Sequence, residues 1–157
     1  MPRMSEAAAA KPRPPFDRWT IELHDPRFGF RWYREPGIMI DHLTVPHGTV
    51  SMVAAMMERL DELFVERGPA IEEAGGLTIV GDWRAVRSYD PPARQLFLEE
   101  LRKPRKIKRS IVVLARAGSF LRMAVQAASM VAAVVGAPSI AISDDMNAVL
   151  REHAIDR

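Results

Sequence analysis

The sequence contains no cysteine, and this absence excludes several kinds of chemistry. A chain without thiols forms no disulfide bond and has neither a thiolate nucleophile nor a thiolate metal site. Long apolar runs are absent as well, because the longest one, residues 123–135, includes Gln126 and Ser129 and is too short to span a bilayer. Near the first residue, the apolar residues 7–10 form a stretch far shorter than the core of a secretory signal. We therefore expect a cytoplasmic protein that is not an integral membrane protein.

A strong excess of charge is also missing. The net charge is +2, so the field of the whole molecule is weak, and the place where basic residues cluster matters more than their number. The length of 157 residues fits one domain, and a hydrophobic content of 48% is enough for a core. Residues 1–15 are rich in alanine, proline and basic residues and have no apolar periodicity, which predicts a disordered tail before a single domain at residues 16–157.

Short apolar runs predict the strands. In the second half of the chain these runs are residues 77–80, 111–114 and 139–142. Near-continuous apolar runs are typical of strands that are buried on both faces of a parallel sheet. In the first half, alternating runs separated by turn signals predict antiparallel strands at residues 19–23, 28–33 and 38–43. The pattern predicts an α/β fold in which a mixed sheet of about six strands packs with about four helices.

Capping residues mark where the helices begin. The expected starts are Thr49 or Ser51, Asp90-Pro91, Ser119 and the run Ser143-Asp144-Asp145. The first helix has apolar residues at spacings of three and four, which form one buried stripe. We expect it to end at Gly68-Pro69, followed by a loop at residues 70–75.

The third expected helix is apolar around most of its circumference. Only a thin line of polar residues, Arg122, Gln126 and Ser129, runs along it. A helix of this kind is usually buried on more than one side. Either neighbouring helices of the same chain or a second chain covers it, and the sequence favours neither.

The segment at residues 102–109 is strongly basic, with six basic residues among its eight. It is either an anion-binding patch or a solvated connector whose charges complement the end of the preceding helix. The connector is the more common case, and it leaves room for weak contact with an anionic surface. No aromatic residue lies in this segment, so a specific nucleic-acid site is not expected.

Catalytic and metal-binding patterns are scarce. Asp82 and the pair Asp144 and Asp145 follow buried strands, where a magnesium site or a small active site is conceivable, but turn and capping roles explain them better. His42 and His47 lack the spacing of a zinc site. No nucleophile elbow, phosphate loop or dinucleotide-binding fingerprint occurs. We expect no enzyme activity, no cofactor and no metal.

The order of the expected elements over residues 19–154 resembles the STAS-like superfamily, whose members include the anti-sigma-factor antagonists. The best local match is Leu77-Thr78-Ile79-Val80-Gly81-Asp82-Trp83 followed by the turn at Asp90. It looks closest to divergent bacterial relatives grouped with lipid-binding CRAL-TRIO folds. In typical antagonists a phosphorylated serine follows the aspartate, whereas here Pro91 and Pro92 follow Asp90, so the phosphoacceptor position is lost. Ser88 lies just upstream. The resemblance implies a non-enzymatic regulatory module that binds a protein partner or a second copy of itself.

Two sets of site residues follow. The predicted partner-binding residues are Ser88, Asp90, Arg94, Arg122, Gln126 and Ser129. The alternative function is binding of a lipid or another apolar ligand, because methionine side chains adapt to irregular ligands. That pocket would be lined by Met56, Met57, Met123 and Met130.

Overall fold

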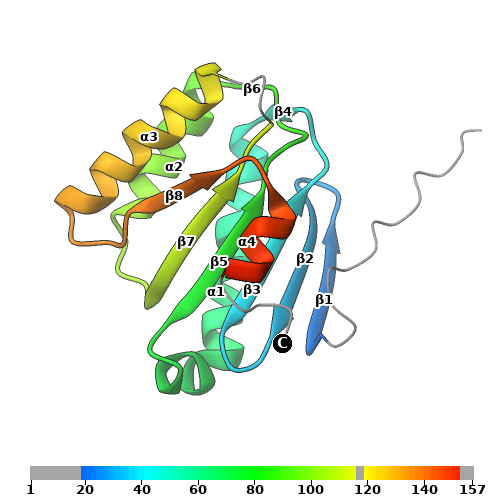
Figure 1. Cartoon of the computed structure of the whole chain (residues 1–157), viewed down its shortest axis with the longest axis vertical. Helices are drawn as coiled ribbons and strands as arrows, with labels where there is room; N and C mark the ends of the chain where they lie inside the picture. Colours follow the sequence, from blue (N-terminus) through cyan, green and yellow to red (C-terminus); the bar gives the residue numbers. More distant parts are fainter. Residues whose placement is uncertain (1–18, 116–118, 153–157) are drawn as a thin grey trace, which may run out of the picture.

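The structure is a computed structural model, and it describes residues 19–115 and 119–152 (Figure 1). The expected tail at residues 1–15 lies outside the described residues. The main sheet contains β1 (Ile21–Asp25), β2 (Gly29–Arg34), β3 (Ile38–Leu43), β5 (Leu77–Asp82), β7 (Ile107–Val113) and β8 (Ile140–Ser143). The short strands β4 (His47–Gly48) and β6 (Ser88–Tyr89) form a second, two-stranded sheet. The helices are α1 (Val50–Glu73), α2 (Pro91–Leu101), α3 (Ser119–Val134) and α4 (Met146–Glu152).

The predicted α/β fold with a mixed sheet is confirmed. The main sheet has six strands in the order β1-β2-β3-β5-β7-β8. The pairs β1–β2 and β2–β3 are antiparallel, and the pairs β3–β5, β5–β7 and β7–β8 are parallel. The three apolar runs of the second half therefore lie side by side, as their composition predicts.

Helices cover both faces of this sheet. Helices α1, α2 and α3 lie on one face and α4 lies on the other, as Figure 1 shows. The alternation along β3 follows this division, because Met39 packs in the cluster under α1 whereas Ile40 packs in the cluster under α4. Among the described residues, no helix combines the length and the apolar character that crossing a membrane requires.

Helix α1 is longer than the sequence predicts. The expected end at Gly68-Pro69 is wrong, because the helix continues through both residues to Glu73. The proline removes one backbone donor, but Ile71, two residues further on, is fully buried and holds the last turn against the sheet. The helix ends instead in a Schellman motif, in which the N–H of Gly76 donates to Ile71 O at 2.9 Å and that of Gly75 to Glu72 O at 3.0 Å.

Two other features differ from expectation. Strand β7 begins at Ile107, so the second half of the basic segment is part of the sheet rather than of a connector. The pairing of β4 with β6 was not predicted, since strands of two residues carry no periodic pattern. This pairing matters for the site, because it brings His47 beside Ser88.

Candidate functional site

Three side chains meet at the start of α2. His47 Nδ1 lies 2.6 Å from Ser88 Oγ, and His47 Nε2 lies 2.6 Å from Asp90 Oδ1. All three sit at the surface, where water weakens their interaction. With Nε2 donating to Asp90, the imidazole places an acceptor within reach of the Ser88 hydroxyl. These two contacts of His47 also connect β4 to β6 and to the first turn of α2.

The structure brings together two predicted partner residues, Ser88 and Asp90, through a third that sequence reasoning missed. Asp90 occupies the N-cap position, but its side chain makes no capping hydrogen bond and faces His47 instead. His47 lies more than forty positions earlier in the chain, so no local motif joins it to this turn. The only feature of the sequence that could have pointed to His47 is its place in a Pro-His-Gly turn.

A small apolar hollow lies beside this turn, where α1, α2 and α3 meet. Its volume is about 60 Å³. Tyr89, Ala93 and Arg94 line it from the α2 side, and Leu121 and Ala124 line it from α3. The predicted residue Arg94 is exposed and stands at this hollow. The start of α2 therefore meets the covered side of α3 at this hollow.

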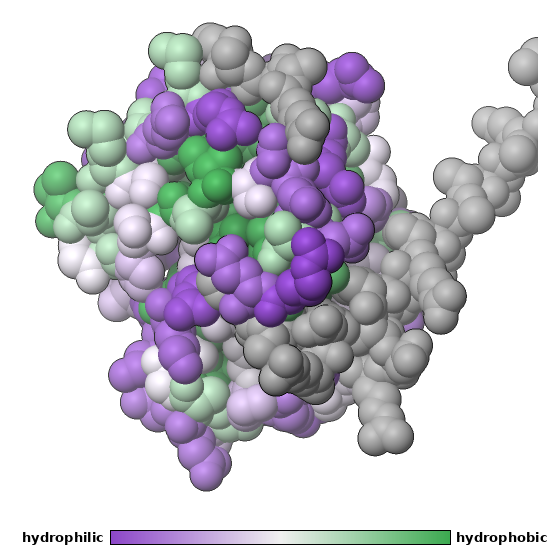
Figure 2. Space-filling model, viewed as in Figure 1, coloured by the Kyte–Doolittle hydropathy of each residue, from purple (hydrophilic) through white to green (hydrophobic). Residues whose placement is uncertain are grey.

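Helix α3 has one covered side and one open side. Leu121, Val125, Ala128 and Ala132 are buried against the rest of the chain. On the open side Met123 is 65%, Met130 72% and Val134 87% exposed. Apolar residues accordingly reach the surface along the edge formed by α3 in Figure 2.

The predicted polar line of α3 is not uniformly outward. Gln126 is exposed, whereas Arg122 and Ser129 are only half-exposed. Ser129 Oγ accepts a hydrogen bond of 2.8 Å from the backbone N–H of Ile140, so it secures the start of β8. The outward face of α3 therefore presents mainly the apolar stripe Met123, Met130 and Val134, which we call the α3 stripe.

A second hollow is a cavity of about 110 Å³ between the sheet and the helices on its α1 side. Met56 and Met57 line it, as the apolar-ligand alternative predicts. Met123 and Met130 do not, because they lie on the open side of α3. The four methionines therefore do not form one pocket.

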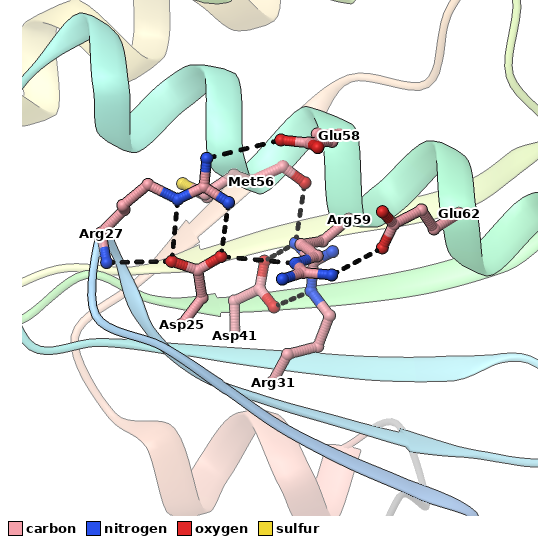
Figure 3. A network of polar contacts seen from close by, with 8 residues as sticks. All are labelled: Asp25, Arg27, Arg31, Asp41, Met56, Glu58, Arg59 and Glu62. Atoms are coloured by element: carbon pink, nitrogen blue, oxygen red, sulfur yellow. Dashed lines mark hydrogen bonds and ion pairs between the residues drawn. The ribbon is translucent and has the colours of Figure 1, made fainter.

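A buried ion pair forms part of the cavity wall. Arg31 on β2 donates from Nε to Asp41 Oδ1 at 2.5 Å and from Nη2 to Asp41 Oδ2 at 2.7 Å, and Nη2 also donates to the Met56 carbonyl at 3.2 Å (Figure 3). The two residues are partners in the register of β2 and β3, and both side chains are nearly fully buried. The Phe28 ring centroid lies 5.3 Å from the Arg31 guanidinium carbon. The sequence placed both charges on expected strands but gave no sign that they face inward.

A more exposed ion-pair network borders this pair. The buried Asp25 accepts hydrogen bonds from Arg27 on its own turn and from Arg59 on α1 (Figure 3). The hydrogen bonds from Arg27 hold the pKa of Asp25 well below its usual range, although burial opposes this. The network fastens the β1–β2 turn to α1, which closes the helix side of the sheet.

The first half of the basic segment is largely paired with acidic residues. Arg105 donates to Asp61 Oδ1 at 2.9 Å and to Glu100 Oε2 at 2.7 Å, and Lys103 donates to Glu100 Oε1 at 2.6 Å. Burial would raise the pKa of Glu100, but the hydrogen bonds from Lys103 and Arg105 outweigh it and lower that pKa. Lys106 Nζ lies 3.3 Å from Glu72 Oε1, so this lysine is paired with an acidic residue as well.

The acidic residues at the strand ends have structural partners. Burial would raise the pKa of Asp82, but hydrogen bonds from Arg84 and His42 lower it well below its usual range. Asp145 Oδ1 accepts the backbone N–H of Ala148 at 3.0 Å and so caps α4. Within the described ranges, no cluster of three or more histidine, aspartate or glutamate residues could hold a metal ion.

These observations define the protein as an α/β domain with a mixed six-stranded sheet, an open apolar helix face and a charged cavity. Comparison of the chain with protein-family models, curated proteins and solved structures finds no match. The resemblance to the STAS-like superfamily accordingly stays a prediction from the sequence.

Proposed function

We propose that this chain is a cytoplasmic, non-enzymatic interaction module of STAS-like type, and that its α3 face pairs with a second copy of the chain. The observation that carries this proposal is the α3 stripe, in which Met123, Met130 and Val134 are all mostly exposed. Single exposed apolar residues are ordinary, but large ones gathered on one helix face are typical of interaction sites.

Several features favour a second copy as the partner. The stripe residues recur at intervals of seven and four positions, so they share one side of the helix. Arg122 is the only charged residue of α3, so two such helices can approach about a twofold axis with little repulsion between like charges. Strand β8, beside α3, is an edge strand and adds backbone groups to the same region.

The start of α2 presents a second surface, separate from the α3 stripe. Ser88, Asp90 and Arg94 are polar groups next to an apolar hollow, which is the arrangement of a binding surface with an apolar centre and a polar border. The STAS-like order of elements supports a regulatory role for this turn. Because Pro91 and Pro92 occupy the positions after Asp90, the proposal does not include the phosphorylation switch of the typical antagonists.

The alternative of lipid binding receives less support. Ligand pockets for drug-sized molecules have volumes of about 300–1,000 Å³. The cavity on the α1 side of the sheet measures about 110 Å³, which is too small for an acyl chain of a membrane lipid, and the hollow of about 740 Å³ beside it, at residues 101–107 and 135–138, is an open surface bordered by basic side chains.

Light scattering over a range of protein concentrations tests the proposal. We expect a dimer whose dissociation constant rises at least about tenfold, or 1.4 kcal/mol, when Met130 is replaced by glutamine. Val65→Gln is the matched control, because Val65 is 85% exposed but stands on α1, away from the α3 stripe. A strict monomer at about 1 mM, or equal effects of the two substitutions, refutes pairing through α3.

A further inference from the structure

The methionines of the chain differ sharply in their exposure to solvent. Met39, Met52 and Met56 are buried in the core. Met123 and Met130 on α3 are 65% and 72% exposed, and every other methionine that the structure describes is buried or half-buried. A reagent in solution therefore reaches the two thioethers of α3 before it reaches those of the core.

Exposed thioethers are the side chains of this protein that a peroxide oxidises most readily, because the chain has no cysteine to react in their place. Hydrogen peroxide transfers one oxygen atom to the methionine sulfur. Its O–O bond breaks, an S–O bond forms, the sulfur loses two electrons and the peroxide is reduced to water. The product, methionine sulfoxide, is polar where the thioether was apolar, and reductases convert it back.

Both exposed methionines lie on the surface of the proposed pairing. Met123 and Met130 are seven positions apart, about two turns of the helix, and form the α3 stripe together with Val134. The side chains of the stripe contain no hydrogen-bond donor. A sulfoxide oxygen that is buried against the stripe of another copy would lose its contact with water and gain no partner there, which is unfavourable.

We propose that Met123 and Met130 form a reversible oxidation site through which a peroxide separates the paired chains. This inference rests on the proposed pairing through α3 and names the regulation of that surface. The thioether form pairs, and the sulfoxide form is monomeric. Pairing in turn covers both sulfurs, so the peroxide reacts with the separated chain.

Peroxide treatment of the full chain tests the proposal, with peptide mass spectrometry and light scattering as the two measurements. The treatment is carried out below the dissociation constant of the dimer, where both sulfurs are open to solvent. We expect Met123 and Met130 each to gain one oxygen atom at least about tenfold faster than the buried Met39, Met52 and Met56. The dissociation constant should then rise at least about tenfold, and reductases specific for the two sulfoxide epimers should restore it.

Leucine substitutions separate oxidation of α3 from oxidation elsewhere. Met123→Leu/Met130→Leu keeps apolar side chains of similar volume on the stripe but removes both sulfurs. This variant should pair as the original chain does and keep its dissociation constant after peroxide treatment. Met57→Leu/Met146→Leu is the matched control, because these half-buried methionines pack in core clusters away from the stripe. Pairing of the control should remain sensitive to the peroxide.

The outcomes distinguish this proposal from the proposed pairing. A dimer that persists although Met123 and Met130 carry sulfoxide overturns the oxidation site and leaves the pairing intact. Peroxide-driven separation of the Met123→Leu/Met130→Leu dimer, or oxidation of the buried methionines as early as the exposed two, also overturns the oxidation site alone. A chain that is monomeric before any peroxide is added refutes the pairing, and the oxidation site is refuted with it.

Discussion

Replacing Asp41 with leucine tests whether water is excluded from the ion pair between β2 and β3, as its geometry indicates. The substitution removes the acceptor of two guanidinium hydrogen bonds while Arg31 remains at 4% exposure. Breaking a buried pair by removal of one partner costs about 3–5 kcal/mol, because a charge stays in the interior without compensation. For a domain of this size the loss corresponds to a fall in Tm of roughly 10 °C.

The double variant Arg31→Met/Asp41→Leu makes the test specific. Both positions then carry apolar side chains of similar volume next to Phe28 and Met56. Because no charge remains to be desolvated, its unfolding free energy should lie within about 1 kcal/mol of the original chain or exceed it by 1–4 kcal/mol. The double variant is therefore expected to be more stable than Asp41→Leu alone.

Urea and thermal unfolding of the three proteins measure these differences. An unchanged m-value would show that the variants unfold from equally compact folded states. A cost below about 1 kcal/mol for Asp41→Leu contradicts the reasoning, because it would mean that water reaches Arg31. A double variant no more stable than the single one would show that packing around the pair, and not its charge, controls stability.

Three further predictions concern the backbone in and after α1 and the carboxyl end of β5. Pro69→Ala should raise the unfolding free energy by about 1 kcal/mol or more in a urea titration, because alanine restores a helix hydrogen bond. Gly76→Ala should destabilise the protein by more than Gly75→Ala in the same assay. Both glycines have a positive φ, 124° at Gly76 and 82° at Gly75, but only the Cβ added at Gly76 would lie 2.9 Å from a backbone nitrogen, that of Lys108. The lowered pKa of Asp82 means that its contribution to stability is present above about pH 4 and fades as the pH falls below that value. Asp82→Asn should therefore flatten the decline of the urea midpoint between about pH 5 and pH 2, and a decline as steep as the original would contradict the role of the Arg84 pairing.

Much of the candidate surface was visible in the sequence because it depends on local patterns. The apolar character around most of α3 predicted burial on more than one side, by neighbouring helices or by a second chain, and the Asp90-Pro91 pair marked the start of α2. The polar line along α3 was a weaker guide, since a small rotation of a helix moves Ser129 from the surface to a contact with β8. His47 could not be assigned to the site, because its partner strand consists of only two residues.

The sequence by itself determined the α/β class and the neighbourhood of the three apolar strands, because hydrophobic periodicity is set by each segment on its own. Only the tertiary structure decided that α1 passes through Pro69, that Arg31 and Asp41 face inward, and that the basic segment borders a cavity. Each of these depends on contacts between segments distant in the chain, such as Ile71 against the sheet and Arg105 against Asp61. Such contacts offset local penalties of a few kcal/mol, and no local pattern records them.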